Sequence, residues 1–103
     1  MSVTTITKDN FEAEVMGSEK PVLLDFWAAW CSPCRTMSEI VDSIAEERAD
    51  IKVCKINVDE QPELAGDFGI MSIPTLTVIK NGKSSGSSVG VKSKKAIMNM
   101  LDS

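Results

Sequence analysis

Two cysteines three positions apart are the part of the sequence best suited to chemistry. They lie in the stretch Trp30-Cys31-Ser32-Pro33-Cys34. Two thiols at this spacing can form half of a zinc site, a structural cross-link, or a dithiol that exchanges with other disulfides. Each interpretation requires different surroundings elsewhere in the chain.

The supply of metal ligands argues against zinc. The chain has three cysteines and no histidine, whereas a structural zinc site normally uses four Cys or His ligands. Zinc would therefore need a carboxylate ligand or a second subunit, and we expect no metal. The lack of histidine also excludes Cys-His hydrolases, which need an imidazole base. The exchanging dithiol is favoured.

Length and composition fit one domain over residues 1–103, which we expect to act as a monomer. The net charge is −4 and no basic run exceeds Lys94-Lys95, so nucleic-acid binding is not expected. The longest apolar stretch, 22–30, is too short to span a bilayer and contains Asp25, which argues against membrane insertion. No signal peptide is evident at the N-terminus, so we expect a cytoplasmic protein. In that compartment a close Cys pair is more often catalytic or metal-binding than structural.

The elements that must position the pair follow from hydrophobic periodicity. A β-branched run predicts a strand over 1–6, and Phe11 and Val15 predict a helix over 7–16, with Thr7 or Asp9 as its N-cap. The continuous apolar run 21–30 is typical of a strand buried on both faces. After the pair, one face of a helix repeats at offsets of three and four residues: Met37, Ile40, Val41, Ile44 and Ala45. The acidic residues Glu39, Asp42, Glu46 and Glu47 are predicted on its other faces.

The second half of the chain continues this alternation. Residues 51–58 are β-branched and predict a strand, and Pro62 predicts the start of a short helix. A strand over 74–80 ends at the turn pair Asn81-Gly82, so the serine-rich segment 83–88 is predicted to be a weak edge strand. Ser93 can cap a last helix. The order βαβαβαββα indicates the α/β class, with a mixed, mostly parallel sheet of about five strands flanked by four helices.

The dithiol is predicted where a buried strand ends and a helix begins, with Pro33 in the first helical turn. Unpaired N–H groups and the helix dipole there favour an anionic sulfur. Cys31 should be the more exposed thiol, with the lower pKa, and act as nucleophile, while Cys34 resolves the mixed disulfide. Lowering a thiol pKa from ~8.5 to ~7 needs about 2 kcal/mol, more than a helix terminus usually gives. Hydrogen bonds from the Cys34 thiol or nearby amides should supply the rest.

Three stretches in this order, VLLDFWAAWCSPC, SIPTLTVIKNG and VGVKSK, resemble the thioredoxin family across essentially the whole chain. The resemblance implies the thioredoxin fold and reduction of protein disulfides by the Cys31-Cys34 dithiol. It implies no bound cofactor, because a thioredoxin reductase supplies the electrons to that disulfide. Two alternatives remain open: a related disulfide isomerase or oxidant, and an interaction subunit that uses the same surface without redox turnover.

The resemblance also assigns roles to residues outside the pair. Asp25 would be buried behind the dithiol with a raised pKa and accept the Cys34 proton, with Lys55 on the adjacent strand as its neighbour. The alternative interpretation of Asp25 is a satisfied core carboxylate with no catalytic part. Pro74 would follow a cis peptide bond, leaving the Ile73 backbone free to pair with a substrate. The implied apolar docking surface consists of Trp30, Met71, Ile73, Pro74, Gly90 and Val91.

The sequence departs from the family pattern at three places. Ser32 replaces the usual Gly between the cysteines, and Glu39 stands where a helix-kinking proline is common. Met71-Ser72 stand where relatives often have a basic residue and Gly, which puts partner preference in doubt. The third cysteine, Cys54, is predicted to be buried as a small apolar residue.

Overall fold

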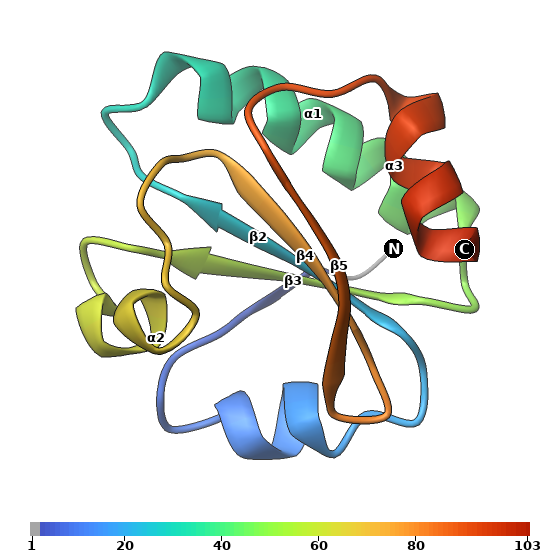
Figure 1. The fold of residues 1–103 in the computed structure, drawn as a ribbon, viewed down its shortest axis with the longest axis horizontal. Helices are drawn as coiled ribbons and strands as arrows, with labels where there is room; N and C mark the ends of the chain where they lie inside the picture. The colour runs from blue at the N-terminus through green and yellow to red at the C-terminus, as the bar shows by residue number, and fades with distance from the viewer. Residues whose placement is uncertain (1–2) are drawn as a thin grey trace.

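The computed structural model describes residues 3–103, and its elements follow the predicted order (Figure 1). Met1 and Ser2, the first two residues of the first predicted strand, lie outside this range. The elements are β1 (Val3–Thr5), η1 (Glu12–Met16), β2 (Val22–Trp27), α1 (Ser32–Glu47), β3 (Lys52–Asn57), α2 (Pro62–Asp67), β4 (Thr75–Lys80), β5 (Lys83–Val89) and α3 (Lys94–Asp102).

The sheet is mixed, as predicted, with the strand order β1-β3-β2-β4-β5. Strands β1, β3 and β2 are parallel, whereas β4 runs antiparallel to β2 and β5 antiparallel to β4. Helices α1 and α3 cover one face, and η1 and α2 cover the other (Figure 1). The three-layer arrangement predicted from the alternation of strands and helices is confirmed.

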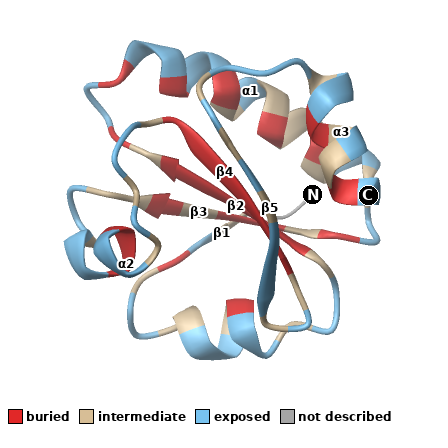
Figure 2. Ribbon diagram, viewed as in Figure 1, coloured by how far each residue is buried: buried red, intermediate tan, exposed pale blue. Residues whose placement is uncertain are grey.

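Each face of the sheet has its own hydrophobic core, and the central strands are buried between the two (Figure 2). Under α1 and α3, Leu23 of β2 packs with Met37 and Ile97. Under η1 and α2, Leu24 and Phe26 of β2 pack on the other side. Because side chains alternate along a strand, Asp25 shares the face of Leu23 and points to the side of α1.

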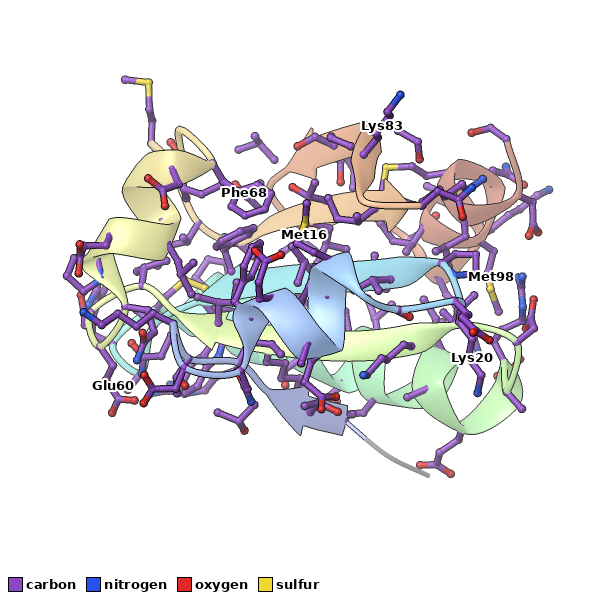
Figure 3. The ribbon with its side chains drawn as sticks, turned by 90° about the horizontal axis from the view of Figure 1, so that it is seen from below. Met16, Lys20, Glu60, Phe68, Lys83 and Met98 are labelled. Carbon is purple, nitrogen blue, oxygen red and sulfur yellow. A yellow bond between two sulfur atoms is a disulfide. The ribbon has the colours of Figure 1, made fainter. Side chains whose placement is uncertain are left out.

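An aromatic cluster joins the elements of the second face. Phe68, labelled in Figure 3, lies just after α2. Its ring centroid is 5.8 Å from that of Phe11 and 5.3 Å from that of Phe26. These contacts fix the segment that leads from α2 toward Pro74.

The first helix is shorter than predicted. Thr7 to Asn10 form a turn in which the Thr7 N–H donates to Asn10 Oδ1 at 2.8 Å and Asn10 Nδ2 donates to the Thr5 carbonyl at 3.0 Å. The helical segment η1 has Phe11 as N-cap without a side-chain hydrogen bond, so it begins later than predicted. Thr7, one of the two predicted caps, does cap the preceding turn: its Oγ1 accepts the Asp9 N–H at 3.2 Å and its carbonyl accepts the Phe11 N–H at 3.0 Å. In return the Asn10 side chain accepts the Thr7 N–H, so both side chains satisfy free N–H groups at the start of the segment.

The C-terminal elements match their predictions. Asn81 and Gly82 have φ of 53° and 75°, the left-handed values that a tight hairpin needs, and they connect β4 to the predicted edge strand β5. Ser93 caps α3, because its Oγ accepts the Ala96 N–H at 3.1 Å.

Candidate active site

The cysteine pair forms a disulfide at the start of α1. The two Cα atoms are 5.2 Å apart. Cys31 is the N-cap of α1, and its Sγ accepts the Cys34 N–H at 3.2 Å. Ser32 and Pro33 occupy the exposed first turn of the helix. The helix-terminus position and the amide donor predicted for Cys31 are therefore both present.

Both sulfur-bearing residues are nearly buried in the oxidised protein. Cys31 is 4% exposed and Cys34 is 2% exposed, so Cys31 is the more exposed only by a small margin. The Cys31 Sγ lies 3.9 Å from the Ile73 carbonyl oxygen. The side chain of Trp30, by contrast, is largely exposed beside the pair. The oxidised site thus presents an apolar rim, with the disulfide just beneath it.

The loop opposite the disulfide contains Pro74. The Ile73-Pro74 peptide bond is cis, as the resemblance implies, and Pro74 is buried. Its carbonyl accepts the Gly90 N–H at 2.8 Å, and Gly90 has φ of 89°, a value that favours glycine. Val91 follows with an exposed side chain. The structure therefore joins the Pro74 loop to the Gly90-Val91 segment, which lies far away in the sequence.

An apolar groove of about 350 Å³ borders the disulfide. It contains three residues of the predicted docking surface, Trp30, Met71 and Ile73. It also contains residues that the sequence analysis missed: Val58, Ile70 and Ser72. Met71 is 95% exposed, so an apolar side chain at the groove is open to solvent.

Asp59 is another residue that the sequence analysis missed. Its Oδ2 accepts a hydrogen bond from Trp30 Nε1 at 2.8 Å. Because β2 and β3 are parallel, the segments after their C-terminal ends lie at the same edge of the sheet. That rule could have placed Asp59, two residues after β3, near Trp30.

Asp25 is fully buried within β2. Among residues 3–103, neither of its carboxyl oxygens has a hydrogen-bond partner. Burial raises the pKa of Asp25 to about 7, with the Lys55 charge acting to lower it and the Asp42 charge to raise it. A carboxyl group with this pKa can take up and release a proton near neutral pH.

Lys55 is the direct neighbour of Asp25 in the sheet register, but its ammonium group bonds elsewhere. Lys55 Nζ lies 2.9 Å from Asp42 Oδ1 and donates to Ser38 Oγ at 2.5 Å. The sequence analysis missed this use of Ser38 and placed Asp42 on another face of the helix. The helical spacing could have predicted this placement, because Ser38 and Asp42 follow Cys34 by four and eight residues and so share one side of α1.

Cys54 and Glu39, which the sequence analysis also singled out, lie outside the site. Cys54 is fully buried in the core between the sheet and η1, and burial raises the pKa of its thiol to about 11. A thiol in that environment is a poor nucleophile. Helix α1 is continuous through Glu39, whose side chain is exposed.

Within residues 3–103, no group of three or more His, Cys, Asp or Glu side chains is arranged to hold a metal ion. Within the same range, no helix combines the length and apolar character needed to cross a membrane.

Comparison with known proteins identifies the family. The thioredoxin family model matches residues 2–103. A thioredoxin from Porphyra purpurea is 46% identical over 103 residues, which cover 99% of this chain and 96% of the relative. Thioredoxin 1 from Synechococcus elongatus is 46% identical over 99% of this chain and 97% of the relative, and a thioredoxin from Streptomyces clavuligerus is 46% identical over 90% and 87%. This chain belongs to the thioredoxin family of thiol-disulfide oxidoreductases.

Proposed function

We propose that the protein reduces disulfides in other proteins, acting as a monomeric single domain in the cytoplasm and drawing its electrons from a thioredoxin reductase. The observation that carries this proposal is the position of Cys31. Its sulfur caps a helix of 16 residues and accepts the Cys34 N–H, so a thiolate formed there gains a hydrogen bond and a favourable dipole.

In the first step, the Cys31 thiolate attacks one sulfur of the substrate disulfide. A bond forms between Cys31 Sγ and that sulfur, the substrate S–S bond breaks, and the other substrate sulfur leaves as a thiolate that takes a proton from solvent. The nearly buried position of Cys31 requires the substrate to approach along the apolar rim.

In the second step, Cys34 attacks Cys31 Sγ in the mixed disulfide and restores the Cys31-Cys34 bond. The second substrate sulfur leaves, so the substrate gains two electrons and the protein loses two. Cys34 must first give up its thiol proton, and Asp25 is the proposed acceptor because its pKa of about 7 lies close to the working pH. Lys55 is assigned a supporting role through its charge, which favours ionised Asp25.

Substrate docking is assigned to the groove and to the loop opposite the disulfide. An extended substrate segment can pair with the backbone of Ile73 and rest on Trp30, Met71 and Val91. The cis bond before Pro74 and the hydrogen bond from Gly90 hold that loop against the site. The exposed Met71 favours substrates with an apolar side chain near the disulfide.

The experiment that tests this function is the reduction potential of the Cys31-Cys34 couple, measured by equilibration with defined thiol buffers and alkylation of free thiols. Thioredoxins lie near about −270 mV, which serves as the family benchmark, and we expect a value close to it. A value between about −180 and −120 mV would instead indicate an isomerase or an oxidant. Absence of a reversible two-electron couple would leave only a redox-independent binding role.

A further inference from the structure

Two polar side chains, Ser38 and Asp42, follow Cys34 along one side of α1 and contact the charged neighbour of Asp25, Lys55. Cys34, Ser38 and Asp42 are spaced four residues apart on α1 and therefore lie on one side of the helix. Ser38 and Cys34 also line a common hollow of about 270 Å³, together with Trp27, Ala28, Ala29 and Arg35. The polar side chain of Ser38 thus lies beside the resolving cysteine, and that of Asp42 lies one turn further along the same side of the helix.

The ammonium group of Lys55 is held by these two polar side chains. It donates to Ser38 Oγ at 2.5 Å and pairs with Asp42 Oδ1 at 2.9 Å. Lys55 is only 17% exposed in its side chain, so few other positions are open to its charge. The sheet register places it directly beside Asp25, yet within residues 3–103 the Asp25 oxygens accept no hydrogen bond.

We infer that Ser38 is a positioning residue, whose hydroxyl acts with the Asp42 carboxylate to hold the Lys55 ammonium away from Asp25 and so leaves Asp25 able to take the Cys34 proton. A direct ion pair between Lys55 and Asp25 would favour the ionised carboxylate and lower its affinity for that proton. This inference rests on the proposed role of Asp25 as proton acceptor.

The proton affinity of Asp25 is therefore controlled by Lys55 and by the two side chains that hold it, Ser38 and Asp42. The charged groups that act on Asp25 are Lys55 from β3 and Asp42 from α1. From β4, the register neighbour of Asp25 is the apolar Leu76. Loss of the Ser38 hydroxyl removes one hydrogen bond of the Lys55 ammonium. The ammonium can then move closer to the Asp25 carboxyl group.

The test is an NMR titration of the Asp25 carboxyl carbon in the oxidised protein. Relative to the native chain, Ser38→Ala should lower the midpoint by about half to one pH unit, because the positive charge comes closer. Lys55→Met should raise it, because the positive charge is gone. In the Lys55→Met background, Ser38→Ala should have no further effect, since the hydroxyl acts through Lys55.

Two further variants control for nonspecific effects. Ser38→Thr keeps the hydroxyl and should retain the native midpoint. Ser43→Ala is a matched control on the same helix: Ser43 Oγ accepts Lys94 Nζ at 2.7 Å, and Lys94 also pairs with Glu47. It should leave the Asp25 midpoint unchanged.

The inference fails if Ser38→Ala leaves the midpoint unchanged or raises it. It also fails if Ser38→Ala lowers the midpoint equally in the Lys55→Met background, because water entering the hollow would then be the cause. The pH profile of disulfide reduction should move in the same direction as the titration. Since the titration needs no turnover, its failure is separate from a failure of the reductase proposal, which the reduction potential decides.

Discussion

The two ends of α1 handle polar groups in opposite ways. At the N-terminal end, the Asp25 carboxyl group is fully buried and has no hydrogen-bond partner among residues 3–103. At the C-terminal end, Arg48 donates to Asp50 Oδ2 at 2.8 Å and to Asp102 Oδ1 at 2.9 Å, and both carboxylates are more than half exposed.

The pKa values reflect the same difference. Burial raises the pKa of Asp25 to about 7, whereas the hydrogen bond from Arg48 lowers the pKa of Asp50 to about 2. A buried charge without a partner costs stability, and a paired surface charge contributes a little. The unfavourable carboxylate thus lies where the proposed mechanism moves a proton, and the favourable one lies at the opposite end of α1.

The largest expected effect is on chemistry at the N-terminal end. Cys31→Ser should reduce turnover in an insulin-disulfide reduction assay by roughly a thousandfold or more, because a hydroxyl cannot replace the thiolate nucleophile. Cys54→Ala is the matched control, since that thiol is buried away from the site and should leave turnover of the folded protein near native. Comparable losses from both changes would contradict the assignment of Cys31.

The second effect concerns stability and pH. The folded-state pKa of Asp25 lies above its unfolded value, so its ionisation adds no cost below about pH 4 and progressively destabilises the fold as the pH rises through 7. Asp25→Asn should therefore raise the free energy of unfolding at pH 8 by up to about 4 kcal/mol and change it little at pH 4. Urea unfolding at the two pH values measures this difference.

Asp50→Asn is the control from the other end of the helix, with the opposite sign. The folded-state pKa of Asp50 lies below its unfolded value, so its stabilising contribution is present at neutral pH and disappears as pH falls through about 2. Asp50→Asn should slightly destabilise the protein at pH 8. If both substitutions changed stability in the same direction at pH 8, the contrast between the two ends would be wrong.

A smaller effect is expected on docking. Trp30 is 69% exposed, so Trp30→Ala should hardly change the free energy of unfolding. It should raise KM for a protein disulfide about tenfold, because an exposed aromatic side chain at a docking surface is a typical binding hot spot. Steady-state kinetics measure this change. Met16→Ala is the control, because it removes a partly exposed apolar side chain on η1 and should leave KM unchanged. Equal KM changes would remove the groove from the proposed docking surface.

The smallest effect is expected at Arg48. Arg48→Ala should cost about 1 kcal/mol of stability, because each of its two partly exposed ion pairs contributes little. Reductase activity and the midpoint of the Asp25 titration should stay at their native values. Denaturant unfolding combined with that titration checks this, and a shifted Asp25 midpoint would mean that the two ends are coupled.

The sequence predicted the framework better than the contacts. The order of elements, the cap at Ser93 and the position of Cys31 at the start of α1 follow from local patterns, and the structure contains all three. The helix predicted over 7–16 divides into a turn capped by Thr7 and the helical segment η1, a division that periodicity does not reveal. Local patterns thus locate an element but not the geometry of each of its turns.

Within the site, a residue with a local sequence signal could be predicted, whereas contacts between residues far apart in the sequence could not. Asp25 could be identified because a carboxylate inside an apolar run is conspicuous. The resemblance implied that Lys55 lies beside Asp25 in the sheet. It did not show that the Lys55 ammonium pairs with Asp42 instead of Asp25, because that depends on side-chain geometry across two elements. The Trp30 to Asp59 hydrogen bond likewise joins residues 29 positions apart. Such contacts require the tertiary structure.

The outer strand β5 has a consequence for the behaviour of the protein at high concentration. A strand at the edge of a sheet offers unpaired backbone groups to any second chain, and edge-to-edge stacking of this kind leads to aggregation. Here the edge begins with the exposed Lys83, Ser84 and Ser85, and its pairing with β4 is irregular at Val78/Ile79. Within the part of the chain that the structure describes, the opposite edge, β1, spans three residues. A protein proposed to bind extended segments of many other chains therefore gives its own copies little surface on which to stack, which favours colloidal stability in a crowded solution.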